Sequence, residues 1–114
     1  MIETISRDEL RTALERGEQI ALLEVLPADY FAEAHLPGAL NLPLDRLEEL
    51  APRLVPDHDS AIVVYCKNEG CRNSEIAARR LARLGYANVR DYVGGKADWL
   101  EAGLPVESGL AAAA

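Results

Sequence analysis

The chain of 114 residues is poor in the residue types that define several classes of protein. It has two cysteines and two histidines, which excludes the disulfide framework of small secreted domains. No apolar run approaches the roughly 18 residues that a membrane-spanning helix needs. Residues 1–4 carry neither a basic nor an apolar signal region. We therefore expect a cytoplasmic protein that has no membrane partner.

Basic residues are also scarce. The chain has 12 Lys and Arg and 19 Asp and Glu, which gives a formal net charge of −7. Such a chain offers no basic face to a nucleic acid or to an anionic membrane surface. A small anionic substrate would need a local positive pocket. Hydrophobic residues make up 49%, enough for a core of its own. We expect one domain over residues 1–107 and a short C-terminal tail over residues 108–114.

Short apolar runs alternate with segments of helical periodicity. The runs are apolar throughout, which is typical of strands covered on both faces and favours an α/β fold, with helices on both faces of a parallel sheet. Ser6 and Glu9 form a capping-box pattern before the first helix. The predicted strands are residues 20–25, 61–65 and 89–93, and the predicted helices are residues 7–16, 73–84 and 96–102.

The loop of residues 66–72, Cys-Lys-Asn-Glu-Gly-Cys-Arg, joins a predicted buried strand to the clearest predicted helix. In a parallel sheet, sites lie beyond the carboxyl ends of the strands. The helix N-terminus, Lys67, Arg72 and a turn at Gly70 would favour an anion there, so we expect a Cys66 pKa below its usual value of about 8.5. Cys66 would then be a nucleophilic thiolate, with loop N–H groups stabilising the substrate. The alternative is a small buried hydrophobic residue at a strand end.

Several segments resemble motifs of the rhodanese-like (thiosulfate sulfurtransferase) family. Residues 22–25 and 30–43, with His35-Leu-Pro-Gly-Ala, resemble its first motif, and residues 63–66 resemble the strand that leads into its active-site cysteine. Residues 92–99, Tyr-Val-Gly-Gly-Lys-Ala-Asp-Trp, and residues 102–106 resemble its closing motif. The resemblance covers nearly the whole chain and implies a single rhodanese-like domain with a central parallel sheet of about five strands and an extended active-site loop.

Two departures from the family pattern keep an alternative activity open. Glu24-Val25-Leu26 stands where the family often has Asp-Val-Arg, and five residues rather than four separate Cys66 from Arg72. That longer spacing occurs in cysteine-dependent phosphatases and arsenate reductases, in which an arginine binds the oxyanion. Two observations disfavour a phosphatase. Glu69 would repel a phosphate dianion, and the sequence marks no aspartate as a general acid for a leaving alkoxide.

The remaining candidate residues have structural and functional interpretations. Cys71 is either a resolving thiol for an oxidised Cys66 or a small packing residue. His35 and His58 lack metal-ligand spacing with the cysteines, so we expect no metal, and we expect His35 to bond within the following turn. Gly94 and Gly95 should let a turn pass close to the loop. Core packing is expected for Trp99, and a solvated helix face for three arginines, Arg79, Arg80 and Arg83.

The resemblance implies a sulfurtransferase that works without a cofactor. Cys66 would take the outer sulfur of thiosulfate or a similar small anionic donor as a persulfide and pass it to cyanide or a thiol, including a protein thiol. A sulfur carrier or sensor without turnover is a further alternative. The residues predicted to bind the donor are Lys67, Asn68, Glu69, Gly70, Cys71, Arg72 and Ser74.

Overall fold

The computed structural model describes residues 2–109 and contains a five-stranded parallel sheet. The strand order is β1-β5-β4-β2-β3, with β4 in the centre. The bounds are β1 Glu3–Thr4, β2 Ile20–Glu24, β3 Leu40–Asn41, β4 Ala61–Tyr65 and β5 Val89–Tyr92. The predicted α/β class with a parallel sheet of about five strands is confirmed.

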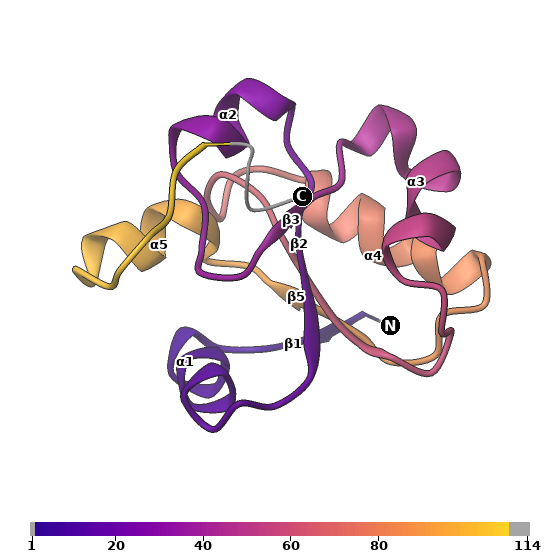
Figure 1. The fold of residues 1–114 in the computed structure, drawn as a ribbon, viewed down its shortest axis with the longest axis horizontal. Coiled ribbons are helices and arrows are strands. Elements are labelled where there is room, and N and C mark those ends of the chain that lie inside the picture. Colours follow the sequence, from indigo (N-terminus) through magenta and orange to yellow (C-terminus); the bar gives the residue numbers. More distant parts are fainter. Residues whose placement is uncertain (1, 110–114) are drawn as a thin grey trace.

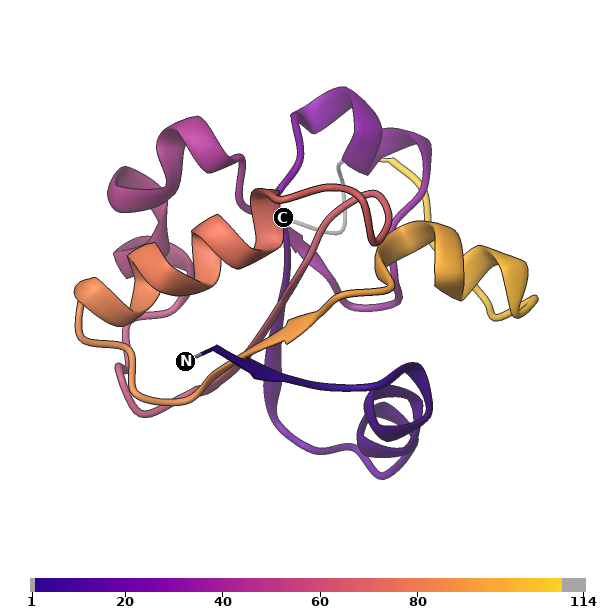
Figure 2. The same ribbon diagram turned by 180° about the vertical axis from the view of Figure 1, so that it is seen from behind.

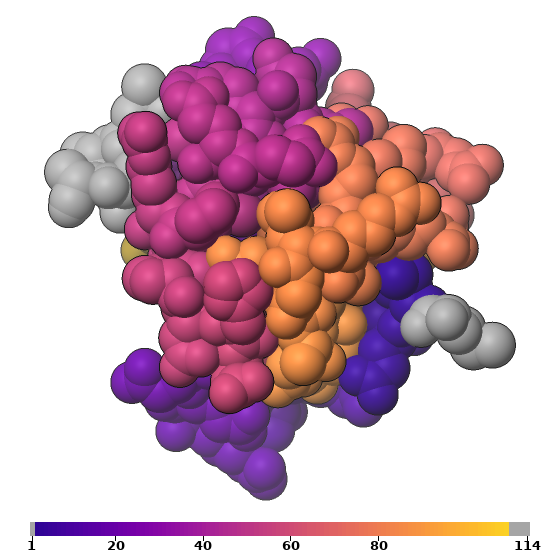
Figure 3. Space-filling view, turned by 90° about the vertical axis from the view of Figure 1, so that its right-hand side faces the viewer, coloured from indigo at the N-terminus to yellow at the C-terminus, as the bar shows by residue number. Residues whose placement is uncertain are grey.

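Helices cover both faces of this sheet (Figures 1 and 2). The helices are α1 Arg7–Glu15, α2 Ala28–Glu33, the 3₁₀ turn η1 Leu44–Arg46, α3 Leu47–Leu54, α4 Asn73–Arg83 and α5 Gly95–Glu101. On one face, Leu47 of α3 and Leu81 of α4 join a core with the strands, and the two helices lie side by side in Figure 3. On the other face, Leu10 of α1 and Trp99 of α5 form a second core.

Local sequence patterns located the longer elements to within one or two residues. The Ser6 hydroxyl accepts from Glu9 N at 3.1 Å and the Glu9 carboxylate accepts from Ser6 N at 2.9 Å, so the predicted capping box is present. Helix α5 begins at Gly95 rather than at residue 96. The short strands β1 and β3 and the segments α2, η1 and α3 were not predicted, because two-residue strands and a helix containing Pro52 carry little periodicity.

The division into a domain and a tail stays a prediction, because residues 110–114 of the expected tail lie outside the described residues. Of that tail, Gly109 N donates to Ala32 O at 2.7 Å. Within residues 2–109, no helix combines the length and the apolar character needed to cross a bilayer.

Candidate active site

Cys66 lies at the carboxyl end of the central strand β4, where the parallel strands end together. The strand register places Glu24, Tyr65 and Tyr92 at one level across three neighbouring strands, and Cys66 directly follows. Its exposed fraction is 1%. The loop of residues 66–72 then leads into α4 at Asn73. The structure therefore places the cysteine at the edge of the sheet where sites of α/β folds form.

The start of α5 holds the backbone of the loop in place. Lys96 N donates to Cys66 O at 2.9 Å, and Ala97 N donates to Lys67 O at 2.8 Å. Gly95 has a φ of +68°, and a Cβ atom there would lie 2.7 Å from Cys66 O. This close approach confirms the prediction that the Gly94-Gly95 turn passes next to the loop.

We expect Gly95→Ala to destabilise the protein by about 2–4 kcal/mol, because the left-handed backbone and the collision with Cys66 O both penalise a side chain. Gly17→Ala is the matched control, since Gly17 has a φ of +72° but a Cβ atom there would have no neighbouring atom within 4 Å. It should cost only about 1 kcal/mol, the effect of the backbone conformation alone. Urea unfolding of both variants measures the difference, and equal losses would contradict the close contact at Gly95.

Asn68 engages two of the backbone N–H groups that the sequence predicts to form an anion cradle. Gly70 N donates to Asn68 Oδ1 at 3.0 Å, and Cys71 N donates to Asn68 O at 3.1 Å. The loop is therefore closed on itself by an Asx turn at Asn68. Presentation of these two N–H groups to a substrate requires that the Asn68 bonds open.

Burial raises the pKa of the Cys66 thiol to about 11. The sulfur lies 3.4 Å from Cys71 O and 3.5 Å from Ser74 Oγ. Loss of solvation is the largest cause of the raised pKa, and the Cys71 side chain raises it further, whereas hydrogen bonds from the Ser74 hydroxyl and the Ser74 backbone lower it. The prediction of a lowered pKa is therefore wrong in this structure, since the sequence shows the helix N-terminus and the cations but not the depth of burial.

The two cations of the loop lie at its exposed surface. Arg72 Nη2 donates to Glu75 Oε2 at 3.2 Å, and 75% of the Arg72 side chain is exposed. Lys67 Nζ lies 5.7 Å from the centroid of the Tyr30 ring. Neither cation is among the groups that shift the Cys66 pKa.

The remaining loop residues are also divided between the surface, where Lys67 and Arg72 lie, and the interior, where Cys66 lies. Glu69 and Gly70 are exposed, Asn68 and Cys71 are half-buried, and Ser74 is buried at the first turn of α4. Cys66 and Cys71 are both free thiols. The structure thus brings Cys66, the Cys71 carbonyl and Ser74 together, while the role of Cys71 as a resolving thiol stays a prediction.

A buried ion pair beneath the loop was not predicted. Lys96 Nζ donates to Glu24 Oε2 at 3.1 Å and to Tyr30 O at 2.9 Å, and the Tyr65 hydroxyl donates to Glu24 Oε1 at 2.8 Å. Glu24 is fully buried, and burial raises the pKa of its carboxyl against the opposing effects of Tyr65 and Lys96. The only sequence signal was Glu24 itself, a charged residue ending an apolar strand.

His35 is structural, but its partner differs from the one expected. Its Nδ1 lies 2.8 Å from Phe31 O and its ring stacks on Phe31, so it bonds back to α2 rather than within the following turn. His35 follows Phe31 by four residues, so this bond is a short-range one at the end of α2. Within residues 2–109, no three His, Cys, Asp or Glu side chains are grouped to hold a metal ion.

The expectations for Trp99 and the arginines of α4 largely hold. Trp99 is buried and its Nε1 donates to Pro105 O at 2.8 Å, which confirms a packing role. Arg79 and Arg83 are exposed on the outer face of α4. Arg80 is half-buried rather than fully solvated, because it pairs with Glu48 of α3.

Cys66 should react slowly with iodoacetamide at neutral pH. Because only the thiolate reacts and the pKa is raised to about 11, the rate should climb about tenfold per pH unit between about pH 8 and pH 10. Mass spectrometry of the peptide that contains Cys66 follows this cysteine separately from Cys71. A rate that is already constant above neutral pH would show that the thiol is ionised there and would contradict the effect of burial.

Comparisons with known proteins agree with the fold and with the place of Cys66 in it. Residues 6–102 match the family model described as "Rhodanese-like domain". The human thiosulfate:glutathione sulfurtransferase is 33% identical, with 86% of this chain and 93% of that protein covered. A crystal structure of a thiosulfate sulfurtransferase from Pseudomonas aeruginosa has a TM-score of 0.82 and 39% identity over 95% of this chain and 20% of that one.

A third relative shows that such a domain also occurs within larger proteins. An HTH-type transcriptional regulator from Mycobacterium tuberculosis is 36% identical over 94% of this chain, which spans only 46% of that protein. The matched region covers strands β2 to β5, the loop of residues 66–72 and all of α5, and it omits only β1 of the sheet. On the strength of that match, the chain belongs to the rhodanese-like domain family.

Proposed function

We propose that the protein is a sulfurtransferase in which Cys66 carries the transferred sulfur as a persulfide. The observation that carries the proposal is the place of Cys66, at the end of β4 and immediately before the loop into α4, within a rhodanese-like fold. Sulfur transfer in general is supported by relatives that are named sulfurtransferases. The identity of the donor, the identity of the acceptor and the persulfide intermediate are parts of our proposal that go beyond sulfur transfer in general.

In the first half-reaction, the Cys66 thiolate attacks the outer sulfur of thiosulfate. A bond forms between Sγ and that sulfur, the sulfur–sulfur bond of thiosulfate breaks, and sulfite leaves with the bonding electron pair. The proton of the resting thiol goes to solvent beforehand. In the second half-reaction, cyanide or a thiolate attacks the outer sulfur of the persulfide, and the Cys66 thiolate is released.

The loop residues would stabilise the anions in both steps. Opening of the Asn68 bonds would free Gly70 N–H and Cys71 N–H, and the first turn of α4 adds its own N–H groups. Lys67 and Arg72 would attract the donor dianion when their contacts with Tyr30 and Glu75 exchange for it. Ser74 Oγ already lies next to the sulfur and can donate to a thiolate or persulfide.

The test is incubation with thiosulfate, followed by peptide mass mapping and by measurement of thiocyanate after addition of cyanide. We expect one added sulfur atom on the Cys66 peptide and catalytic formation of thiocyanate. Loading without turnover would instead identify a sulfur carrier. Absence of both, together with turnover of an aryl phosphate or arsenate, would replace the proposal by the phosphatase or reductase alternative. Glutathione in place of cyanide tests a thiol acceptor.

A further inference from the structure

Asp91 is a buried carboxylate that the proposed function does not use. It lies on β5 with an exposed fraction of 5%, and within residues 2–109 its Oδ1 has no hydrogen-bond partner. A buried carboxylate oxygen without a partner is costly, so its presence calls for a compensating role. The position of Asp91 in the sheet indicates where that role lies.

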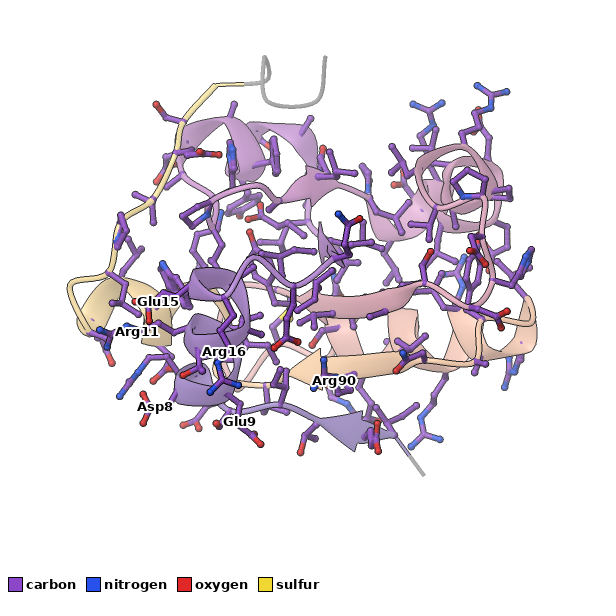
Figure 4. The ribbon with its side chains drawn as sticks, turned by 60° about the horizontal axis from the view of Figure 1, so that its bottom comes forward. Asp8, Glu9, Arg11, Glu15, Arg16 and Arg90 are labelled. Atoms are coloured by element: carbon purple, nitrogen blue, oxygen red, sulfur yellow. The ribbon has the colours of Figure 1, made fainter. Side chains whose placement is uncertain are left out.

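Side chains alternate between the faces of a strand, and the neighbours of Asp91 point away from the active-site face. Arg90 lines one surface pocket with Glu9 of α1 and with Arg16, which follows α1 (all three are labelled in Figure 4), and Tyr92 packs with Trp99 in the core on that same side. Asp91 therefore projects to the opposite face, where α4 packs against β5. Cys66 and Val64 of β4 belong to the core on this face.

Ser74, at the first turn of α4, is buried next to Cys66 in the helix that packs on this face of β5. Its Oγ is 3.5 Å from Cys66 Sγ, and the residue is only 3% exposed. A hydrogen bond from Ser74 lowers the pKa of Asp91 against the raising effect of burial, and another lowers the pKa of Cys66. A serine hydroxyl has one proton to donate. It therefore cannot serve the Asp91 carboxylate and the Cys66 thiolate at the same time.

We propose that Asp91 is a positioning residue of the Cys66 site. It favours the protonated form of Cys66 by competing for the single hydroxyl proton of Ser74. With Asp91 ionised, Ser74 donates to the carboxylate and turns a lone pair toward the sulfur, which favours the thiol. When Asp91 takes up one proton from solvent, the hydroxyl is released and donates to the thiolate or persulfide. The inference rests on the proposed function only in treating Cys66 as the reacting group.

The groups around Asp91 set the pH range of this competition. Burial raises the Asp91 pKa above its ordinary value, and the carboxylate of Glu75 on α4 raises it further. From β4 the facing residues are Val64, its register partner, and the Cys66 thiol, and from β1 the register partner is Thr4. Ionisation of Asp91 therefore occurs closer to neutral pH than for an exposed aspartate.

The decisive measurement is the rate of Cys66 alkylation by iodoacetamide between about pH 5 and pH 10, followed on the Cys66 peptide. In the wild-type protein, the logarithm of the rate should flatten over the pH range in which Asp91 ionises. Asp91→Asn should abolish this flattening and increase the rate at pH 8 about tenfold, the effect of one pKa unit. A rate that is unchanged or lower in Asp91→Asn would overturn the proposal.

The role of Ser74 is tested by a double-mutant cycle. In a Ser74→Ala background, Asp91→Asn should change the rate less than about threefold, because the shared hydroxyl is gone. An undiminished tenfold effect would show a direct action of charge and reject the competition. Asp59→Asn, in an exposed loop, controls for loss of one negative charge. Alkylation needs no sulfur donor, so failure of thiosulfate turnover would refute the proposed function and leave this result standing.

Discussion

Replacement of Cys66 by serine is expected to lower thiosulfate-dependent thiocyanate formation at least about a thousandfold and to remove sulfur loading altogether. A serine hydroxyl neither ionises near neutral pH nor forms a stable bond with a sulfane sulfur. The fold should persist, because serine is of similar size and the Cys71 carbonyl and Ser74 hydroxyl, which lie 3.4 and 3.5 Å from the sulfur, can bond to it. The measurements are steady-state thiocyanate formation and the mass of the intact protein after exposure to thiosulfate.

Cys71→Ser is the matched control for this variant, because Cys71 is the other thiol of the same loop. It should retain sulfur loading on Cys66, since the Cys71 backbone carbonyl that lies 3.4 Å from Cys66 Sγ is retained in the serine variant. Residual turnover in Cys66→Ser that disappears on further replacement of Cys71 would move the nucleophile to Cys71 and contradict the proposal. After mild oxidation, a difference between wild type and Cys71→Ser in reversible protection of Cys66 would reveal a resolving role.

Lys96→Met should destabilise the protein by about 3–5 kcal/mol at pH 8, because it leaves the buried Glu24 carboxylate without its cation. Methionine retains the length of the side chain, so the loss reports the charge rather than a cavity. The loop backbone should stay anchored, since Lys96 N, which donates to Cys66 O at 2.9 Å, is present in any residue but proline.

The loss should depend on pH in a defined direction. Burial already raises the Glu24 pKa, and removal of Lys96 raises it further. A carboxyl whose folded-state pKa lies above its unfolded value binds its proton more tightly when folded, so the stability falls as the pH rises. The deficit of Lys96→Met should therefore be smaller at pH 5 than at pH 8.

The double variant Glu24→Gln, Lys96→Met separates the charge from the other contacts of Lys96. It should recover most of the stability, because a neutral amide can still accept from the Tyr65 hydroxyl, which lies 2.8 Å from Glu24 Oε1. Urea unfolding at the two pH values gives all of the free energies needed. If the single and double variants were equally unstable at both pH values, packing rather than unpaired charge would account for the effect of Lys96.

The parts of the fold that could be predicted are those with a strong local signal. Ser6 and Glu9 sit at the spacing of a capping box, and the structure contains both of its hydrogen bonds. The apolar run of residues 61–65 became the central strand β4, which put Cys66 at the edge of the sheet. Strands β1 and β3 were not predicted, because two-residue strands are defined by their pairing with β5 and β2 rather than by their own residues.

The electrostatics of the site could not be predicted, because charges interact according to distance and solvation rather than sequence separation. Glu24 and Lys96 are 72 residues apart in the chain and form one buried pair. Asp91 and Ser74 are buried on the same face of the sheet only because α4 packs on β5. Arg72, which is adjacent in sequence to the first residue of α4, binds Glu75 at the surface.

By itself, the sequence determined the alternation of strands and helices, the candidate nucleophile Cys66 and the loop in which it lies, because these depend on periodicity and short-range order. Only the tertiary structure decided how Cys66 is solvated. Packing of α4 against the sheet buries the sulfur in the core on that face, and this burial raises its pKa to about 11 although the loop contains two cations. Burial depends on every segment that covers a residue, and those segments come from distant parts of the chain.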